Sequence, residues 1–174
     1  RSHLKLGLPT GNTPLGMYEE LLNRYRDEHL DFSQLRTFNL DEYLGLSNDH
    51  PNSYHTYMRR HFFDHVNVQP GNIQIPDGSV EIDPNAESER YENAIREAGG
   101  IDLLIVGVGA NGHIAFNEPG SAFDSRTRVV DLAPETIRNA QQYFGNEPVP
   151  ARAITMGIGT MLEARRILLL ASGA

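Results

Sequence analysis

Two adjacent carboxylates, Asp41 and Glu42, follow an apolar segment that ends near Asn39. Successive side chains of an extended chain point to opposite sides, so we expect only one of the two carboxylates to face a crevice. A partly desolvated carboxylate there could act as a general base that takes a proton from a carbon next to a carbonyl. An isolated acidic pair is more often a solvated surface feature or a charged helix start, so this pair alone does not establish a site.

A glycine-rich loop at residues 107–120 contains Asn111, His113 and Glu118. A histidine near neutrality can carry protons in either direction, and a carboxylate beside it would fix its tautomer and raise its basicity. A single histidine is usually a core or surface residue with one hydrogen bond. Several polar side chains among glycines within a dozen residues favour a site, and we expect this loop to present all three to one cavity.

The same loop contains a GxGxxG pattern, formed by Gly107, Gly109 and Gly112, and Asp131 follows at about the distance expected of a ribose-binding acid. A dinucleotide-binding fingerprint needs an uninterrupted helix around its third glycine. Pro119 and the glycine after it exclude a long helix here, so a nicotinamide site is not predicted.

The segment at residues 9–14 lies between an apolar run and a segment of helical period. Thr10, Gly11, Asn12 and Thr13 could form an anion cradle, because the free amides of a helix start point toward such a loop. The alternative is that Thr13 is only the N-cap of a helix whose first residue is Pro14, and that the glycine is only a turn residue. No P-loop lysine follows, which disfavours a nucleoside triphosphate.

We predict no metal site and no cofactor. The chain has no cysteine, and the spacing of His113 and Glu118 matches no common ligand motif. His61 and His65, four residues apart in one expected helix, are the weak exception.

Short apolar runs alternate with segments of helical period, which is typical of strand–helix units around a parallel sheet. The predicted fold is a three-layer, doubly wound, mainly parallel α/β domain over residues 1–174, Rossmann-like and apparently truncated at both ends. Ligands bind beyond the carboxyl ends of such strands, where the three loops lie. The expected strands are 4–8, 36–39, 73–75, 101–106, 128–132, 153–156 and 167–170, and the expected helices are 14–28, 53–65, 85–98, 134–143 and 159–164.

Composition excludes several classes of protein. The net charge is −8, and no basic cluster is longer than two residues, which disfavours nucleic-acid binding. No apolar run approaches the roughly 20 residues of a membrane span, and the N-terminal sequence has no signal-peptide layout. The absence of cysteine fits a reducing compartment, so a soluble, cytoplasmic protein is expected.

Seven segments resemble, in order, the landmarks of the glucosamine-6-phosphate deaminase family: LGLPTGNTP, TFNLDEYLGL, HPNSYHTYM, FFDHV, GVGANGHIAFNEPG, SRTRVV and MGIGTML. The resemblance runs from Leu6 to the end of the chain. PTGNTP alone is shared with 6-phosphogluconolactonases, which diverge after the histidine of the third loop. The AFNEP continuation therefore favours the deaminases.

The resemblance implies a doubly wound α/β enzyme that converts glucosamine 6-phosphate to fructose 6-phosphate and ammonia without metal or organic cofactor. The residues from Thr10 to Thr13 resemble its phosphate cradle, and Asp41 resembles the base that moves a proton between C2 and C1. His113 resembles the group that opens the pyranose ring, with Glu118 and Asn111 as its partners. The partner is then a small phosphorylated amino sugar, and a homo-oligomer is compatible with the family.

The chain departs from the family pattern at several positions. Some members have Asp where this chain has Asn111, and a phosphate-binding Arg falls on Gln142, for which Arg138, one helical turn earlier, could substitute. A phosphate-binding Lys would follow the last residue, so the chain as given could be inactive. Of the allosteric cluster, Ser121 and Arg128 have counterparts but the Lys falls on Val130, so no allosteric activation is predicted. A lactonase or other sugar-phosphate isomerase, and a sugar-phosphate sensor without turnover, are the alternatives.

Overall fold

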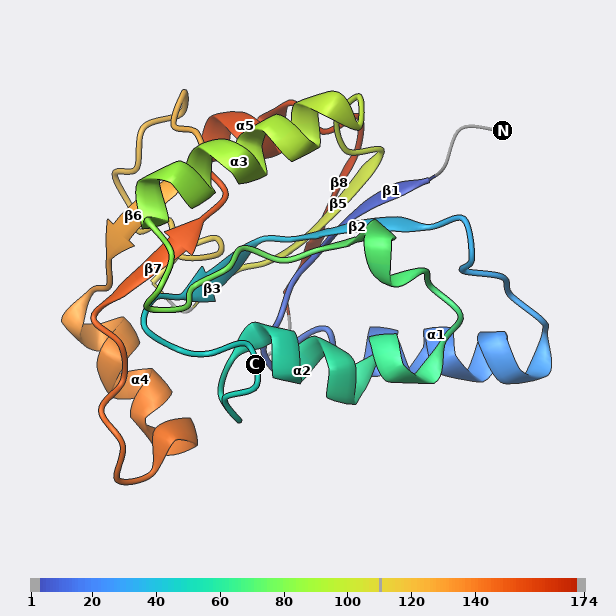
Figure 1. Ribbon diagram of the computed structural model, residues 1–174, viewed down its shortest axis with the longest axis horizontal. Helices are drawn as coiled ribbons and strands as arrows, with labels where there is room; N and C mark the ends of the chain where they lie inside the picture. Colours follow the sequence, from blue (N-terminus) through green and yellow to red (C-terminus); the bar gives the residue numbers. More distant parts are fainter. Residues whose placement is uncertain (1–3, 110, 172–174) are drawn as a thin grey trace.

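The computed structural model describes residues 4–109 and 111–171, which fold into two sheets with helices packed around them (Figure 1). The strands are β1 (Lys5–Leu8), β2 (Arg36–Asn39), β3 (Asp41–Tyr43), β4 (Ile73–Gln74), β5 (Leu103–Gly107), β6 (Arg128–Asp131), β7 (Arg152–Thr155) and β8 (Ile167–Leu170). The α-helices are α1 (Leu15–Asp27), α2 (Tyr54–His61), α3 (Pro84–Glu97), α4 (Pro134–Phe144) and α5 (Ile158–Leu162), and short 3-10 turns cover Phe63–His65 and Pro70–Asn72.

The larger sheet has the strand order β4-β2-β1-β5-β8, and its neighbouring strands are all parallel. Its three inner strands are largely buried, because a parallel sheet that is covered on both faces buries both sets of side chains, and two of them, β1 and β5, are mainly apolar. The predicted α/β fold with a mainly parallel sheet is confirmed. The order also brings the carboxyl ends of β2, β1 and β5 next to one another.

Helices cover both faces of this sheet. In Figure 1, α1 and α2 lie below it, and α3 and α5 lie above it. The lower core packs Leu8 and Ile105 of the sheet against Tyr18 of α1 and Met58 of α2. The upper core gathers Phe38, Leu104, Tyr91, Ile95 and Met161 with their neighbours. The three layers are therefore held by two separate apolar cores.

A second, three-stranded sheet with the order β3-β7-β6 is antiparallel throughout, and its strands were not predicted as a separate sheet. The strand β3 was expected to be a loop, because Asp41, Glu42 and Tyr43 have no apolar alternation. Its pairing with β7 decides the conformation instead. A third core packs this sheet against α4 through residues that include Tyr43, Phe116, Phe144 and Ala153.

All five predicted helices are found, with ends that differ from the prediction, and two of the differences bear on residues considered for the site. The helix expected over 53–65 ends at His61, because Phe62 leaves helical geometry with φ −150° and a separate 3-10 turn follows. His61 and His65 therefore do not share one helix. The N-cap of α1 is Pro14, with no side-chain cap, and the helix begins at Leu15. The expected capping role of Thr13 is wrong.

Candidate active site

The loops that follow β1, β2 and β5 meet at one cavity of about 260 Å³. The cavity is lined by residues of the three loops that the sequence analysis singled out, which include Phe116, and by Tyr54 of α2. This confirms that segments far apart in the chain converge. The lining residues singled out by the sequence are Thr10, Gly11, Asn12, Thr13, Asp41 and His113.

Asp41 is the acidic residue that faces this cavity, and its neighbour Glu42 points away from it. Asp41 is 6% exposed, whereas Glu42 is 1% exposed and binds the start of α2. This arrangement confirms the prediction that only one carboxylate faces the crevice. Burial, together with the neighbouring Glu42 charge, raises the pKa of Asp41 well above its ordinary value. A carboxyl group with a raised pKa suits a general base that works near neutral pH.

The first loop presents its backbone to the same cavity. Gly11 adopts φ +89°, a left-handed conformation that glycine accepts without strain. Within the described residues, no group accepts a hydrogen bond from the amides of Gly11, Asn12 or Thr13. The side chain of Thr13 does not cap α1, and Thr13 lines the cavity. Free amides and hydroxyls before a helix are what an anion cradle requires.

His113 is held in one orientation by Asn111. The Nδ1 atom of the imidazole lies 2.7 Å from Asn111 Oδ1, which also accepts the backbone N–H of His113 at 3.1 Å. The other end of the amide, Nδ2, donates to Glu118 Oε2 at 2.7 Å. The carboxylate can only accept and the backbone N–H can only donate, so the Asn111 amide must turn its NH2 to Glu118 and its oxygen to His113. The Nδ1 atom therefore carries the hydrogen in neutral His113, and Nε2 keeps its lone pair for a ligand.

Glu118 acts on His113 through Asn111 and does not touch the ring. Its second oxygen, Oε1, accepts a 2.6 Å bond from Thr136 Oγ1 of α4. The expectation that Asn111, His113 and Glu118 all face one cavity is therefore corrected, because only His113 is among the residues that line this cavity and the one that adjoins it. The result is a relay of four side chains, His113, Asn111, Glu118 and Thr136, which links the cavity to α4.

Gly109 gives the His113 ring the space that it occupies. A Cβ atom added at Gly109 would overlap three atoms of the His113 ring. The loop after β5 continues as turns, with one isolated bridge between Ile114 and Asn117, and no helix follows. Ala110 lies outside the described residues. The middle glycine of the GxGxxG pattern therefore lets the histidine pack against the backbone, and the pattern does not begin a dinucleotide-binding helix.

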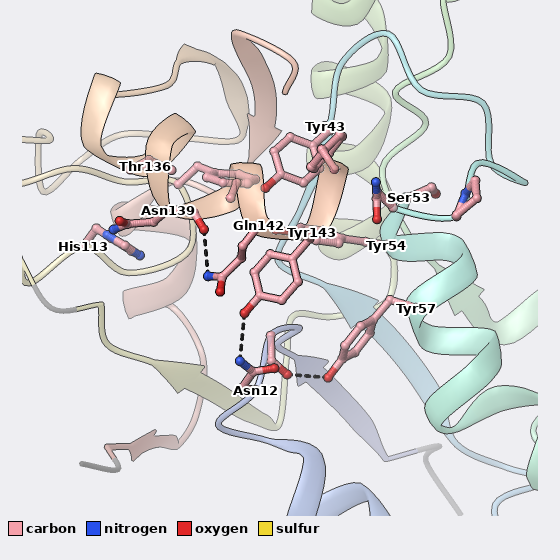
Figure 2. A pocket seen from close by; sticks show the side chains of 16 residues that line it. Asn12, Tyr43, Ser53, Tyr54, Tyr57, His113, Thr136, Asn139, Gln142 and Tyr143 are labelled. Atoms are coloured by element: carbon pink, nitrogen blue, oxygen red, sulfur yellow. Dashed lines mark hydrogen bonds between the residues drawn. The ribbon is translucent and has the colours of Figure 1, made fainter. Parts of the chain in front are cut away.

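A second cavity of about 350 Å³ adjoins the first and shares Gly11, Asn12, Tyr54, His113 and Phe116 with it. Figure 2 shows Tyr57 and Tyr143 reaching from two different helices toward the loop that holds Asn12. Tyr143 Oη accepts a 2.8 Å bond from Asn12 Nδ2, and Tyr57 Oη donates to the Gly11 carbonyl at 2.6 Å. The sequence interpretation missed both tyrosines.

Gln142 and Arg138, the two residues of α4 considered for phosphate binding, differ in their position relative to the cavities. Gln142 lines the second cavity, and its side chain donates to the Asn139 carbonyl of its own helix at 2.9 Å. Arg138 is exposed and lines neither cavity, so it does not take the place expected of a substitute. Among the described residues, no cluster of three or more His, Asp or Glu side chains could hold a metal ion. No helix of the described chain is long and apolar enough to cross a membrane.

Comparison with known proteins gives relatives over the whole chain. The chain is 49% identical over 174 residues to a human protein named glucosamine-6-phosphate deaminase 2, covering 99% of this chain and 63% of that protein. It therefore spans a little under two thirds of that relative. A solved structure described as a monomeric glucosamine-6-phosphate deaminase superposes with a TM-score of 0.92 at 47% identity, covering 95% of this chain and 69% of that one.

A 6-phosphogluconolactonase from Trypanosoma cruzi superposes with a TM-score of 0.72 at 22% identity, covering 98% of this chain and 68% of that one, and this likeness shows the fold alone. The family described as glucosamine-6-phosphate isomerases/6-phosphogluconolactonase matches residues 1–174. The chain, with its doubly wound sheet and its three converging loops, belongs to that family.

Proposed function

We propose that this chain carries the acid–base part of a glucosamine-6-phosphate deaminase site, which converts glucosamine 6-phosphate to fructose 6-phosphate and ammonia. The observation that carries the proposal is the shared cavity, which is lined by Asp41, by His113 and by a loop with free backbone amides. Two relatives named as glucosamine-6-phosphate deaminases, which are 49% and 47% identical in sequence to this chain, support the proposal.

The phosphate is placed at the first loop, where Thr10, Gly11, Asn12 and Thr13 offer amides and side-chain donors. In this proposal the sugar carbons occupy the rest of the cavity, which Asp41 and His113 both line. The cavity of about 260 Å³, with the adjoining one of about 350 Å³, has room for a single phosphorylated sugar. The acidic protein would then hold its anionic group in a local cradle and not by its overall charge.

The first chemical step is ring opening. Neutral His113 presents the Nε2 lone pair, because its Nδ1–H is held by Asn111. It can accept the proton of the anomeric hydroxyl and return a proton to the ring oxygen as the C1–O5 bond breaks. The relay to Glu118 stabilises the imidazolium that forms in between, since the amide dipole of Asn111 is oriented by the carboxylate.

The second step is isomerisation. Asp41 takes the proton from C2 of the open-chain amino aldehyde, a proton moves from the amino group to O1 as the enolamine forms and collapses, and the Asp41 carboxyl group returns its proton to C1. This leaves an imine at C2, and water then adds to it and releases ammonia and the ketose. A raised pKa makes the Asp41 carboxylate a stronger acceptor for the C2 proton.

The test uses the full-length protein and two measurements. Ammonia release and solvent exchange of the C2 proton from glucosamine 6-phosphate are both expected. Hydrolysis of a 6-phosphogluconate lactone without ammonia release would favour the lactonase alternative. Binding of the amino sugar without C2 exchange would favour a sensor.

One of the solved relatives is described as monomeric, so the comparisons give a homo-oligomer no support.

A second measurement addresses the role of His113. In 5-deoxyglucosamine 6-phosphate the hydroxyl that closes the pyranose ring is absent, so this analogue needs no pyranose opening. His113→Ala should therefore reduce turnover of glucosamine 6-phosphate more than C2 exchange in the analogue. Equal defects on both sugars would remove the ring-opening role.

A further inference from the structure

Glu42 is a buried carboxylate to which the proposed chemistry gives no part. It is 1% exposed, yet it accepts four hydrogen bonds. Its Oε2 accepts from Ser53 Oγ at 2.8 Å and from the backbone amides of Tyr54 at 2.8 Å and His55 at 3.3 Å, and its Oε1 accepts from the Tyr43 amide at 2.8 Å. Four donors on two oxygens favour the ionised form of a buried carboxyl group.

These bonds join two parts of the site. Two of the donors are the first amides of α2, so the carboxylate lies at the positive end of that helix. Tyr54, whose amide is held, lines both cavities. Glu42 is also adjacent in the chain to Asp41 on a strand, so fixing Glu42 on one side of β3 directs Asp41 to the other. The Glu42 carboxylate thus holds in place two parts of the cavity lining, Tyr54 of α2 and Asp41 of β3.

The segment around Gly78 packs closely against Glu42. A Cβ atom at Gly78 would overlap the Tyr43 carbonyl and lie 3.1 Å from Glu42 Cγ, so the segment that passes behind Glu42 is packed directly against it. The Gly45 amide donates to the Gly78 carbonyl at 2.6 Å, which fixes this segment to the end of β3. A side chain enclosed in this way transmits its position to the neighbouring backbone.

We propose that Glu42 is a positioning residue for Asp41. Its carboxylate ties β3 to the start of α2 so that the Asp41 side chain faces the cavity, and its negative charge makes Asp41 the stronger proton acceptor. This inference rests on the proposed function, in which Asp41 is the base.

The other titratable groups around Asp41 do not supply this charge. Tyr43, Tyr54 and Tyr91 pack around it from β3, α2 and α3, and burial raises the pKa of each above its ordinary value, so all three are neutral near pH 7. His113 lines the same cavity and could contribute only a positive charge. The pKa of Glu42 itself is raised to about 7 by burial, against the opposing effect of its hydrogen bonds. Its charge is therefore present on the alkaline side of neutrality.

The experiment measures the protonation of Asp41 directly in the full-length protein. The ¹³C NMR titration of labelled aspartate carboxyl groups gives its midpoint, and the resonance that Asp41→Asn removes assigns it. We expect Glu42→Gln to lower this midpoint by about one pH unit, since a nearby like charge is removed. We also expect it to reduce kcat about 10-fold or more, with KM changed less than about threefold. The titration needs no substrate, so it decides the role of Glu42 whether or not the protein turns over the amino sugar.

Glu92→Gln is the matched control. Glu92 also accepts several hydrogen bonds, from Thr127 and Thr160, but it lines neither cavity near Asp41. It should lower thermal stability and leave the Asp41 midpoint and kcat unchanged. A folded Glu42→Gln variant that keeps the wild-type midpoint, or the wild-type kcat, overturns the proposal.

A milder variant serves if Glu42→Gln fails to fold. Ser53→Ala removes one donor from the Glu42 carboxylate and leaves both acidic residues in place. The Glu42 anion is then less stable, so the Asp41 midpoint should move in the same direction by a smaller amount. An unchanged midpoint in Ser53→Ala would contradict the proposed coupling.

Discussion

The side-chain amide of Asn12 donates a 2.8 Å hydrogen bond to the hydroxyl of Tyr143, which joins the loop after β1 to the last turn of α4. The two residues are 131 positions apart in the chain. Because the tyrosine oxygen accepts this bond, its own hydrogen remains available as a donor. Tyr143 is 56% exposed, so that hydrogen can reach a ligand that enters the loop.

Tyr143→Phe should weaken binding of the phosphorylated sugar and leave the chemistry intact. The change removes one donor above the proposed cradle, and a hydrogen bond of this kind contributes about 0.5–1.5 kcal/mol. KM for glucosamine 6-phosphate should therefore rise about 2- to 10-fold with kcat preserved. Tyr25→Phe is the matched control, because Tyr25 packs in the lower core and lines neither cavity. An unchanged KM in Tyr143→Phe would remove this residue from the cradle.

Gly109→Ala should displace His113 without unfolding the domain. The added methyl group would overlap the imidazole ring, which can move aside, and Gly109 does not have a left-handed backbone. A misplacement of about 1 Å can cost about 100-fold in rate, so kcat should fall at least 10-fold while the melting temperature changes little. Gly16→Ala, on α1 with open space around it, should keep full activity and gain about 0.5–1 kcal/mol of stability. Wild-type kcat in Gly109→Ala would show that the ring position is not critical.

The sequence predicts most of the parallel sheet because β1, β5 and β8 are short apolar runs between turn residues. The bounds of β2 and β8 agree with the prediction, and the order of the strands then brings the three loops together. The strand β3 was missed, since three polar and aromatic residues have no strand pattern of their own. Its conformation depends on pairing with β7, whose Thr155 lies opposite Asp41, and no local pattern reports such a distant partner.

Asp41, His113 and the first loop could be predicted because each follows a strand of the parallel sheet, where ligands bind. The relay could not, because spacing alone places Glu118 near His113 without showing that Asn111 lies between them. Tyr57 and Tyr143 were missed for a different reason. Each is an ordinary aromatic residue on an amphipathic helix, and only the packing of α2 and α4 turns it toward the loop.

Asp41→Asn should lose activity and change how stability depends on pH. Burial raises the pKa of Asp41 in the folded state, so the folded protein holds this proton more tightly than the unfolded chain. The resulting stabilisation is complete below the unfolded pKa of about 3.9 and is lost as pH rises through the folded value. At pH 8 ionisation of Asp41 therefore favours the unfolded wild-type chain over the folded protein, and the amide variant has no such group.

The melting temperature of Asp41→Asn relative to wild type should accordingly be higher at pH 8 than at pH 5. Each kcal/mol corresponds to about 2–4 °C for a domain of this size. Comparing the two pH values cancels any constant cost of the amide. The exchange rate at C2 should fall about 10²- to 10⁴-fold. A difference in melting temperature that is the same at both pH values would mean that Asp41 is not desolvated in solution.

Thr136→Val tests whether the relay from α4 reaches the imidazole. The threonine hydroxyl donates 2.6 Å to Glu118 Oε1, and valine has the same shape without the donor. With one oxygen unpaired, the Glu118 carboxylate holds the amide of Asn111 less firmly, and His113 is less well oriented. Turnover of glucosamine 6-phosphate should fall about 3- to 10-fold, because the lost bond contributes about 1 kcal/mol. Thr136→Ser keeps the hydroxyl, and its turnover should stay within about twofold of wild type.

C2 exchange in the 5-deoxy analogue should be nearly unaffected in Thr136→Val, since that sugar needs no pyranose opening. Equal rates for the valine and serine variants would show that the relay ends at Glu118.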